Sequence, residues 1–299
     1  MIITNMSETD YRAHPAISAS DLAAILKCPA KWRFGEKKET PAMQKGTAAH
    51  ACLLEPEKFA AQYYKIPSAD DYEPKALDTV AEIKGFLTSV GVKAPSAANK
   101  PELVALAVEH GGLALEHEIQ KAEYANVRKT GLSKKDYEMV SSMSCTIYAQ
   151  DEYKKMLTGA AVEVSVIGVE CQGVEVKARF DIVTLNGELW DYKTTTDASS
   201  SAFGRAAANY DYWLKMAFYN DMFAQAYGVA PVRTVLLAQE KEVPYLCQAY
   251  RMTTGQLEAG RTAYQMALGI YKRCMEADNW PAYGGGVLEL ETPSFLKTE

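Results

Sequence analysis

The feature that most constrains the fold is a stretch of alternating apolar and polar residues from 161 to 193, AVEVSVIGVECQGVEVKARFDIVTLNGELWDYK. Such alternation is typical of strands that bury one face, and the dipeptides Gln172-Gly173 and Asn186-Gly187 are turn signals. The pattern therefore predicts three consecutive strands joined by tight turns, an antiparallel meander in the middle of the chain.

The second and third strands of this meander carry polar faces. Lys177, Arg179 and Asp181 share one face of the second strand, and Asp191 and Lys193 share one face of the third. The residues that alternate with the first set are expected to face the core together: Ala178, Phe180 and Ile182.

The turn between these strands decides whether the two polar faces coincide. A two-residue loop at Asn186-Gly187 would pair residue 181 with 192 and put Asp181 and Asp191 on opposite sides of the sheet. A three-residue loop, with Gly187 in the left-handed conformation, would pair 181 with 191 and place the carboxylates side by side. The sequence leaves both registers open.

Two carboxylates opposed across a strand pair repel each other and need a compensating cation. A divalent metal such as Mg²⁺ binds carboxylate oxygens and keeps waters that can act in hydrolysis, and a neighbouring lysine can stabilise phosphoryl charge. The alternative is a surface hairpin with scattered charges, which is the usual explanation of a bare Asp-x-Lys pattern because three-residue patterns are common.

Helices are expected before the meander, and helices mixed with strands after it. The expected elements are a helix from Ser18 that stops at Pro29, one from near Gly46 that carries His50, one capped by Ser133 and Asp136, a helical stretch to Gly228, strands at 232–240 and 243–252, and a long helix from Thr253. This order describes an α/β fold.

Residues 77–110 read as a helix, an extended segment and a second helix. This helical hairpin resembles the SAP-type DNA-binding hairpin. A packing or oligomer-contact hairpin explains the pattern equally well.

Composition limits the class of protein. The chain has 299 residues, of which 48% are hydrophobic and 23% charged, as in an ordinary globular domain, and its net charge of −6 argues against a surface coated with basic residues. The sequence shows neither a bilayer-length apolar run nor a signal-like start, so we expect a cytoplasmic protein that does not enter the membrane. Its six scattered cysteines indicate neither a disulfide framework nor a metal cluster.

Five segments resemble, in order, the PD-(D/E)xK nucleases of the RecB type, most closely the RecE-like exodeoxyribonuclease VIII group. They are SASDLAAILKCPAKWRF, KGTAAHACLLEP, VEVKARFDIV, LWDYKTTTDAS and NYDYWLKMAFYNDMF. The resemblance implies a restriction-endonuclease-like core, with a central mixed sheet flanked by helices. Residues 1–299 would then form a single nuclease domain into which the 77–110 hairpin is inserted.

The resemblance also assigns residues to roles. Asp181, Asp191 and Lys193 match the catalytic residues, and His50 joins the two aspartates as a metal ligand. Glu163 is a further candidate ligand, although an edge-strand charge explains it nearly as well. The candidate DNA contacts are Arg179, Thr194, Lys215 and Tyr219. The implied cofactor is Mg²⁺, for which Mn²⁺ can substitute, and no iron–sulfur cluster is expected.

Two positions depart from the family pattern. Phe180 stands where proline is usual before the first aspartate. Lys215 replaces the glutamine of a Gln-xxx-Tyr pair with Tyr219, and a lysine can contact phosphate but cannot accept a hydrogen bond.

The leading hypothesis is a Mg²⁺-dependent 5′-to-3′ exonuclease that acts on linear double-stranded DNA and generates 3′ single strands for recombination. The resemblance further implies a ring-shaped homo-oligomer and a single-strand annealing protein as partner, in a phage-like module. Two alternatives stay open. One is a catalytically weakened DNA-binding protein of the same fold, and the other is a single-strand-specific RecB-type nuclease.

Overall fold

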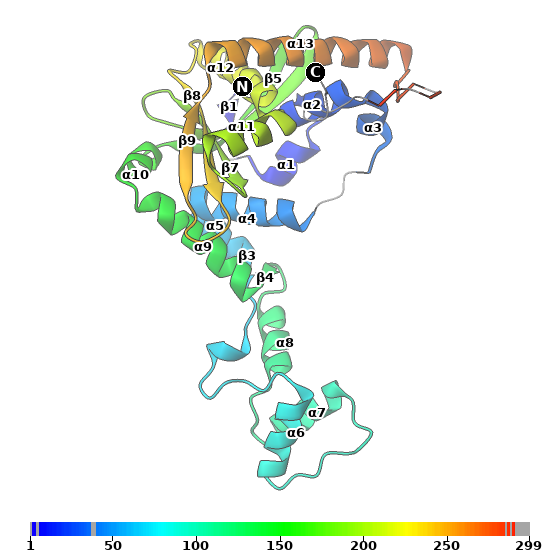
Figure 1. The fold of residues 1–299 in the computed structure, drawn as a ribbon, viewed down its shortest axis with the longest axis vertical. Helices are drawn as coiled ribbons and strands as arrows, with labels where there is room; N and C mark the ends of the chain where they lie inside the picture. Colours follow the sequence, from blue (N-terminus) through cyan, green and yellow to red (C-terminus); the bar gives the residue numbers. More distant parts are fainter. Residues whose placement is uncertain (1, 4–5, 37–39, 285, 288, 291–299) are drawn as a thin grey trace, which may run out of the picture.

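The chain folds around a seven-stranded mixed sheet, as expected for an α/β protein (Figure 1). The computed structural model describes residues 2–3, 6–36, 40–284, 286–287 and 289–290. The strands lie in the order β1-β5-β6-β7-β8-β9, with β2 paired to β6. Their bounds are β1 Ile2–Ile3, β2 Ile17–Ser18, β5 Ala161–Cys171, β6 Val174–Val183, β7 Leu189–Thr195, β8 Thr234–Glu240 and β9 Cys247–Arg251.

The predicted meander is present as β5, β6 and β7, which pair antiparallel in sequence order. β7 then pairs in parallel with β8, because helices α11 (Ser200–Asn209) and α12 (Tyr212–Tyr227) cross over between them. β6 and β7 share only two registered pairs, and β2 occupies part of the edge of β6 that β7 leaves. The sheet therefore opens between β6 and β7.

Helices cover both faces of the sheet and create two cores. One core lies under α2 (Ala19–Lys27), α12 and α13 (Thr254–Ala277), and the other under α4 (Pro41–Leu54), α9 (Lys134–Tyr148) and α10 (Asp151–Leu157). Phe180 belongs to the first core and Ile182 to the second. The expectation that these two side chains share one core face is wrong. β5 changes face at the same point, since Val164 packs in the first core and Val162 against the second, on either side of Glu163 with its φ of 51°.

Helix boundaries differ from the expected ones at three places. After α2, a short helix α3 (Pro29–Phe34) starts with its proline in the first turn, where the missing N–H costs nothing. α4 starts at Pro41 rather than near Gly46, since the Thr40 side chain caps it, and α5 (Pro56–Gln62) follows directly. The expected helix that ends at Gly228 is broken at Asp211, whose φ of 55° is left-handed.

The segment between β3 (Tyr63–Lys65) and β4 (Thr130–Leu132) projects away from the sheet, and we call residues 66–129 the appendage (Figure 1). β3 and β4 pair in parallel at its base. It contains a 3₁₀ turn (Ala69–Asp71) and the helices α6 (Val80–Ser89), α7 (Lys100–Glu109) and α8 (Leu115–Ala125). The two expected hairpin helices are thus present, within an insertion longer than 77–110.

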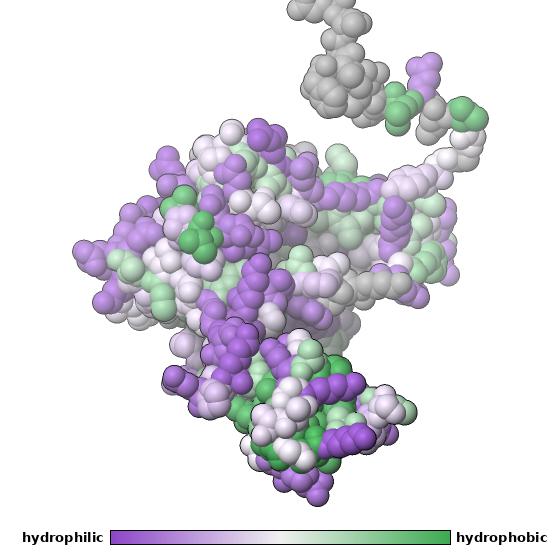
Figure 2. Space-filling model, turned by 60° about the horizontal axis from the view of Figure 1, so that its bottom comes forward, coloured by the Kyte–Doolittle hydropathy of each residue, from purple (hydrophilic) through white to green (hydrophobic). Residues whose placement is uncertain are grey.

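The appendage has its own small core, made largely by apolar side chains of α6 and α7. Figure 2 shows it from below, with apolar surface exposed between charged side chains. None of the helices among the described residues combines the length and apolar character required to traverse a bilayer.

Candidate metal centre

The turn between β6 and β7 is the three-residue loop that the sequence left as one of two possibilities. The Thr184 N–H donates to Glu188 O at 3.0 Å and the Gly187 N–H donates to Thr184 O at 3.0 Å, with Gly187 in the left-handed region at φ 77°. Val183 then pairs with Leu189, and Ile182 with Trp190. The next opposed positions are 181 and 191, so the two aspartates lie side by side.

The strand ladder ends at these two aspartates. Instead of continuing it, the Tyr192 N–H donates to the Asp181 carboxylate, Oδ2, at 2.8 Å. Asp191 stays in β7, where it is paired with Leu236 of β8 and only 3% exposed. The carboxylates therefore sit where β6 and β7 separate.

A third acid, Glu163, lies on β5 next to Asp181. The pairs Val162–Ile182 and Val164–Phe180 flank this position on the two strands. The φ of Glu163 is 51°, a left-handed conformation that costs a non-glycine residue energy and that breaks the regular ladder here. Its carboxylate accepts a hydrogen bond from the Arg179 Nε at 2.5 Å. Three acids on adjacent strands thus form one row.

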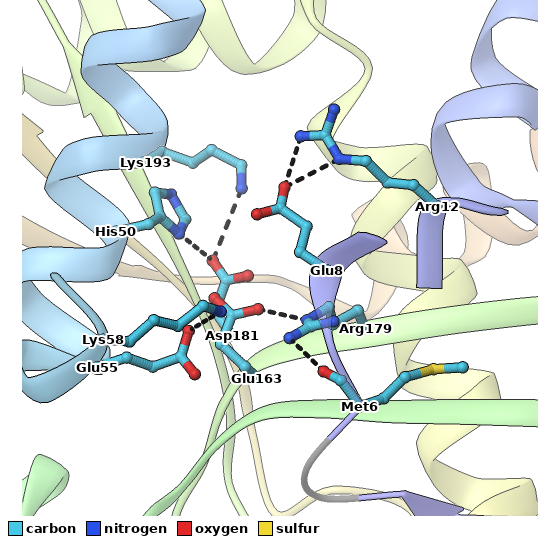
Figure 3. Close-up of polar contacts among 10 residues, drawn as sticks. All are labelled: Met6, Glu8, Arg12, His50, Glu55, Lys58, Glu163, Arg179, Asp181 and Lys193. Atoms are coloured by element: carbon cyan, nitrogen blue, oxygen red, sulfur yellow. Dashed lines mark hydrogen bonds and ion pairs between the residues drawn. The ribbon is translucent and has the colours of Figure 1, made fainter. Parts of the chain in front are cut away.

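His50 approaches this row from α4. Its Nδ1 lies 3.6 Å from Asp181 Oδ2, and its ring packs against Tyr192 with centroids 4.9 Å apart. Ligand atoms of His50, Glu163 and Asp181 all lie within 4.8 Å of one another, and Figure 3 shows them pointing toward one another. One imidazole and two carboxylates are therefore placed to hold a metal ion.

Lys193 lies beside the two aspartates of the row. Its ammonium forms an ion pair with Asp191 Oδ2 and lies 4.0 Å from Asp181 Oδ2. Asp191 Oδ2 accepts no further hydrogen bond among the described residues. Asp191, expected as a metal ligand, is outside the three-residue group and instead holds the lysine.

The charges of this cluster do not balance. Three carboxylates face two cations, Arg179 and Lys193, within a largely buried site. Burial and the neighbouring Asp191 raise the pKa of Asp181 from 3.8 to about 7. Burial and Asp181 likewise raise the pKa of Glu163. Such a surplus of negative charge is what a divalent cation would compensate.

The pKa values of His50 and Lys193 shift in opposite directions. Burial and the nearby Lys193 lower the pKa of His50, which favours the neutral imidazole that a metal requires. Burial alone would lower the pKa of Lys193, but Asp191 and Asp181 outweigh it and raise that pKa. The donor set fits Mg²⁺ or Mn²⁺, with the imidazole suited to the latter.

The four expected DNA contacts occupy different positions. Arg179 is 10% exposed and its Nη2 also donates to Met6 O at 3.1 Å, so it is used inside the protein. Tyr219 packs edge-on against Phe180 with centroids 5.8 Å apart. Thr194 is half-buried on β7 and faces Gly46 of α4. The Nζ of Lys215 lies over the Tyr212 ring, 5.7 Å from its centroid.

The N-terminal segment also supports the site, although the sequence did not indicate it. α1 (Glu8–Ala13) is capped by Ser7, and the Lys177 ammonium donates to Tyr11 O at 2.7 Å and to His14 O at 2.6 Å. Lys177 is thus 5% exposed and acts as a cap for the C-terminal end of α1. A serine three residues before Asp10 was the signal for this helix.

Comparisons with known proteins give one family and a weak fold likeness. The family model described as a PDDEXK-like domain of unknown function (DUF3799) matches residues 18–291. No curated protein matches the chain. Among solved structures, a presumed exonuclease from Eubacterium rectale is 13% identical with a TM-score of 0.45, and the alignment covers 86% of this chain and 97% of that one. SSO0001 is also 13% identical, with a TM-score of 0.26 and coverages of 63% and 86%. The family match alone bears on function.

Proposed function

The chain belongs to this PDDEXK-like family, and we propose that it is a divalent-metal-dependent deoxyribonuclease that hydrolyses DNA phosphodiester bonds. The observation that carries the proposal is the row of three acids on adjacent strands, with His50 and Lys193 next to it.

In this proposal His50, Glu163 and Asp181 hold the ion, which when bound would lower the pKa of a water and neutralise phosphate charge. Arg179 fixes the Glu163 carboxylate by a charge-assisted hydrogen bond. The Tyr192 N–H fixes Asp181 in the same way. Both acids are therefore oriented before the ion arrives.

Lys193 has a different part. Its pKa is raised by Asp191 and Asp181, so the ammonium keeps its proton at neutral pH. A protonated lysine cannot act as a general base. It stabilises the charge that grows on the phosphoryl oxygens and orients the attacking water, while Asp191 keeps it in place.

The test uses a linear duplex labelled at either end, incubated with and without Mg²⁺. We expect metal-dependent loss of label from the wild type, and a much slower loss from Asp191→Ala and Lys193→Ala. Equal loss from the wild type and both variants would refute the assignment.

The finer proposals rest on the resemblance. They are 5′-to-3′ polarity on linear double-stranded DNA, a ring-shaped homo-oligomer, and a single-strand annealing partner. Release of the 5′ label before the 3′ label checks polarity, and light scattering checks the assembly mass. A catalytically weakened DNA-binding protein is the second candidate, favoured by Lys215; DNA binding without metal-dependent cleavage would support it.

A further inference from the structure

The break between α11 and α12 places two tyrosines together. Asp211 is held in its left-handed conformation by Lys27, whose Nζ lies 2.6 Å from Asp211 Oδ2 and donates to Asn209 O at 3.3 Å. The rings of Tyr210 and Tyr212 stack at this break, with centroids 5.8 Å apart and planes 24° apart. Tyr210 is 62% exposed, so one face of the pair is open to solvent.

These rings adjoin the candidate metal centre. The Lys193 Nζ lies 5.5 Å from the Tyr212 centroid and 4.0 Å from Asp181 Oδ2. Tyr212 thus touches the lysine that we place on the scissile phosphate, and Tyr210 extends the aromatic surface outward from it.

Lys215 supplies a charge for this surface. Its Nζ lies 5.7 Å from the Tyr212 centroid, and no described carboxylate comes within 4.0 Å of it. Lys193, by contrast, is paired with Asp191. A half-buried ammonium beside an aromatic ring, without an acidic partner among the described residues, is suited to an anion such as a backbone phosphate.

We propose that Tyr210 and Tyr212 form a stacking platform for an unpaired nucleobase, and that Lys215 binds the phosphate next to the scissile one. This rests on the proposed nuclease function and names its substrate more closely. Only a single strand or an opened end exposes the face of a base, because neighbouring pairs cover both faces inside a duplex. The platform therefore selects an unpaired strand at the active site.

The test measures binding rather than cleavage. A fluorescent single-stranded oligonucleotide is titrated with the full chain in Ca²⁺, and its anisotropy gives Kd. We expect Tyr210→Ala to weaken binding about tenfold and Tyr210→Phe to leave it unchanged. Tyr124→Ala is the matched control, since Tyr124 is 88% exposed on the appendage.

An abasic residue, moved in turn along the oligonucleotide, tests the contact itself. At the stacking position it should weaken wild-type binding by the same factor, and Tyr210→Ala should then cause no further loss. Losses that add at every position, or no loss from Tyr210→Ala, would overturn the platform.

Lys215→Gln, which restores the family residue, tests the phosphate contact. It should reduce the slope of log Kd against log salt by about 0.7, whereas Tyr210→Ala should leave this slope unchanged. An unchanged slope in Lys215→Gln would overturn the phosphate contact. If the losses from the abasic residue and from Tyr210→Ala do not add in Ca²⁺, but no DNA is cleaved in Mg²⁺, the nuclease function is refuted and the stacking platform stands. If DNA is cleaved but these losses add at every position, the platform is refuted and the nuclease function stands.

Discussion

The candidate metal centre and the appendage both carry many ionisable side chains, but they treat these charges in opposite ways. In the centre, three acids are buried in one row with two cations, and the pKa of Asp181 is raised to about 7. In the appendage, the charges lie at the surface and several are paired, as in the Lys75–Asp70 and Lys121–Glu118 ion pairs.

Two helices of the appendage are capped by their own side chains. Thr79 with Glu82 and Asn99 with Glu102 form capping boxes at the starts of α6 and α7. The appendage is complete without a ligand, whereas the centre holds unfavourable charge that a ligand would relieve. Unfavourable buried charge thus distinguishes the candidate site from the appendage.

The comparison also bears on the two alternatives for the 77–110 hairpin. The appendage contains ten acidic and seven basic side chains, a net charge of −3. An acidic surface repels a phosphate backbone, and apolar side chains such as Val90 are exposed on it. We therefore favour contact with protein, such as a second copy of the chain, over contact with DNA.

The largest expected effect is on catalysis. Lys193→Ala should lower the rate of Mg²⁺-dependent hydrolysis by about 10²–10³-fold, because one charge at the phosphate is lost. Initial rates on a labelled duplex measure it, with Lys84→Ala of the appendage as the control. Similar rates in Lys193→Ala and Lys84→Ala would show that the lysine of the candidate metal centre matters no more for hydrolysis than one in the appendage.

The next effect concerns pH and stability. The pKa of Asp181 is about 7 in the folded chain and about 4 in an unfolded one, so the folded state binds the proton more tightly between these values. Without metal, the free energy of unfolding should fall as pH rises from about 4 to about 7, by on the order of 2–4 kcal/mol. Thermal unfolding at pH 5 and pH 8 in chelator measures it, and Mg²⁺ or Mn²⁺ should restore stability at pH 8.

Asp71 of the appendage gives the opposite sign. Hydrogen bonds from Lys65, Ser68 and Lys134 lower its pKa, so its contribution is present above pH 4 and is lost as pH falls. Asp181→Asn should remove the loss of stability toward neutral pH, and Asp71→Asn should not. If the free energy of unfolding depends on pH in the same way in wild type and Asp181→Asn, Asp181 is not the group responsible.

A local effect separates the core of the appendage from the sheet core under α2, α12 and α13. Leu87 of α6 and Leu214 of α12 are both fully buried, and either change to alanine should cost about 2–5 kcal/mol. Hydrogen exchange should show faster exchange only in the appendage for Leu87→Ala, and across the sheet for Leu214→Ala. Exchange that rises everywhere in Leu87→Ala would show that the regions unfold together.

The smallest effect is expected from removing the appendage. Replacing residues 66–129 by a short Gly/Ser linker should leave cleavage of a short duplex within about twofold of wild type, and the salt dependence of DNA binding unchanged. A smaller assembly mass with unchanged DNA binding would identify the appendage as an oligomer contact. Weakened, less salt-dependent binding would instead support the SAP-like alternative.

Much of the fold could be predicted because its signals are local. Alternation indicated the meander, and Asn186-Gly187 limited the register of Asp181 and Asp191 to two choices. The choice between them could not be made, because it depends on whether Leu185 joins the loop. The break at Asp211 was also missed. Asn209 and Asp211 are weak helix formers, but the alanines before them and the apolar spacing after them indicated one helix, and the ion pair from Lys27 comes from 184 residues earlier.

The candidate site was partly predictable for the same reason. His50, Asp181 and Lys193 stand in patterns that the family resemblance covers, and the structure brings them together. Glu163 could be named only as a candidate. Its backbone is left-handed, a conformation that a glycine in the sequence would have indicated and a glutamate does not. Arg179 was placed among the DNA contacts because its pairing with Glu163 depends on strand register.

The anchoring of α1 by Lys177 has a consequence for synthesis. The hydrogen bond from Lys177 to Tyr11 O spans 166 positions, and β1 and β2 likewise pair with strands made much later. As the chain grows from its N-terminus, this first segment has no partner until the meander has emerged. Closing so long a loop is entropically costly and slow, so this segment is among the last to dock. The side chains of the candidate metal centre likewise come together only after β6 has emerged, because Asp181 follows His50 by 131 residues.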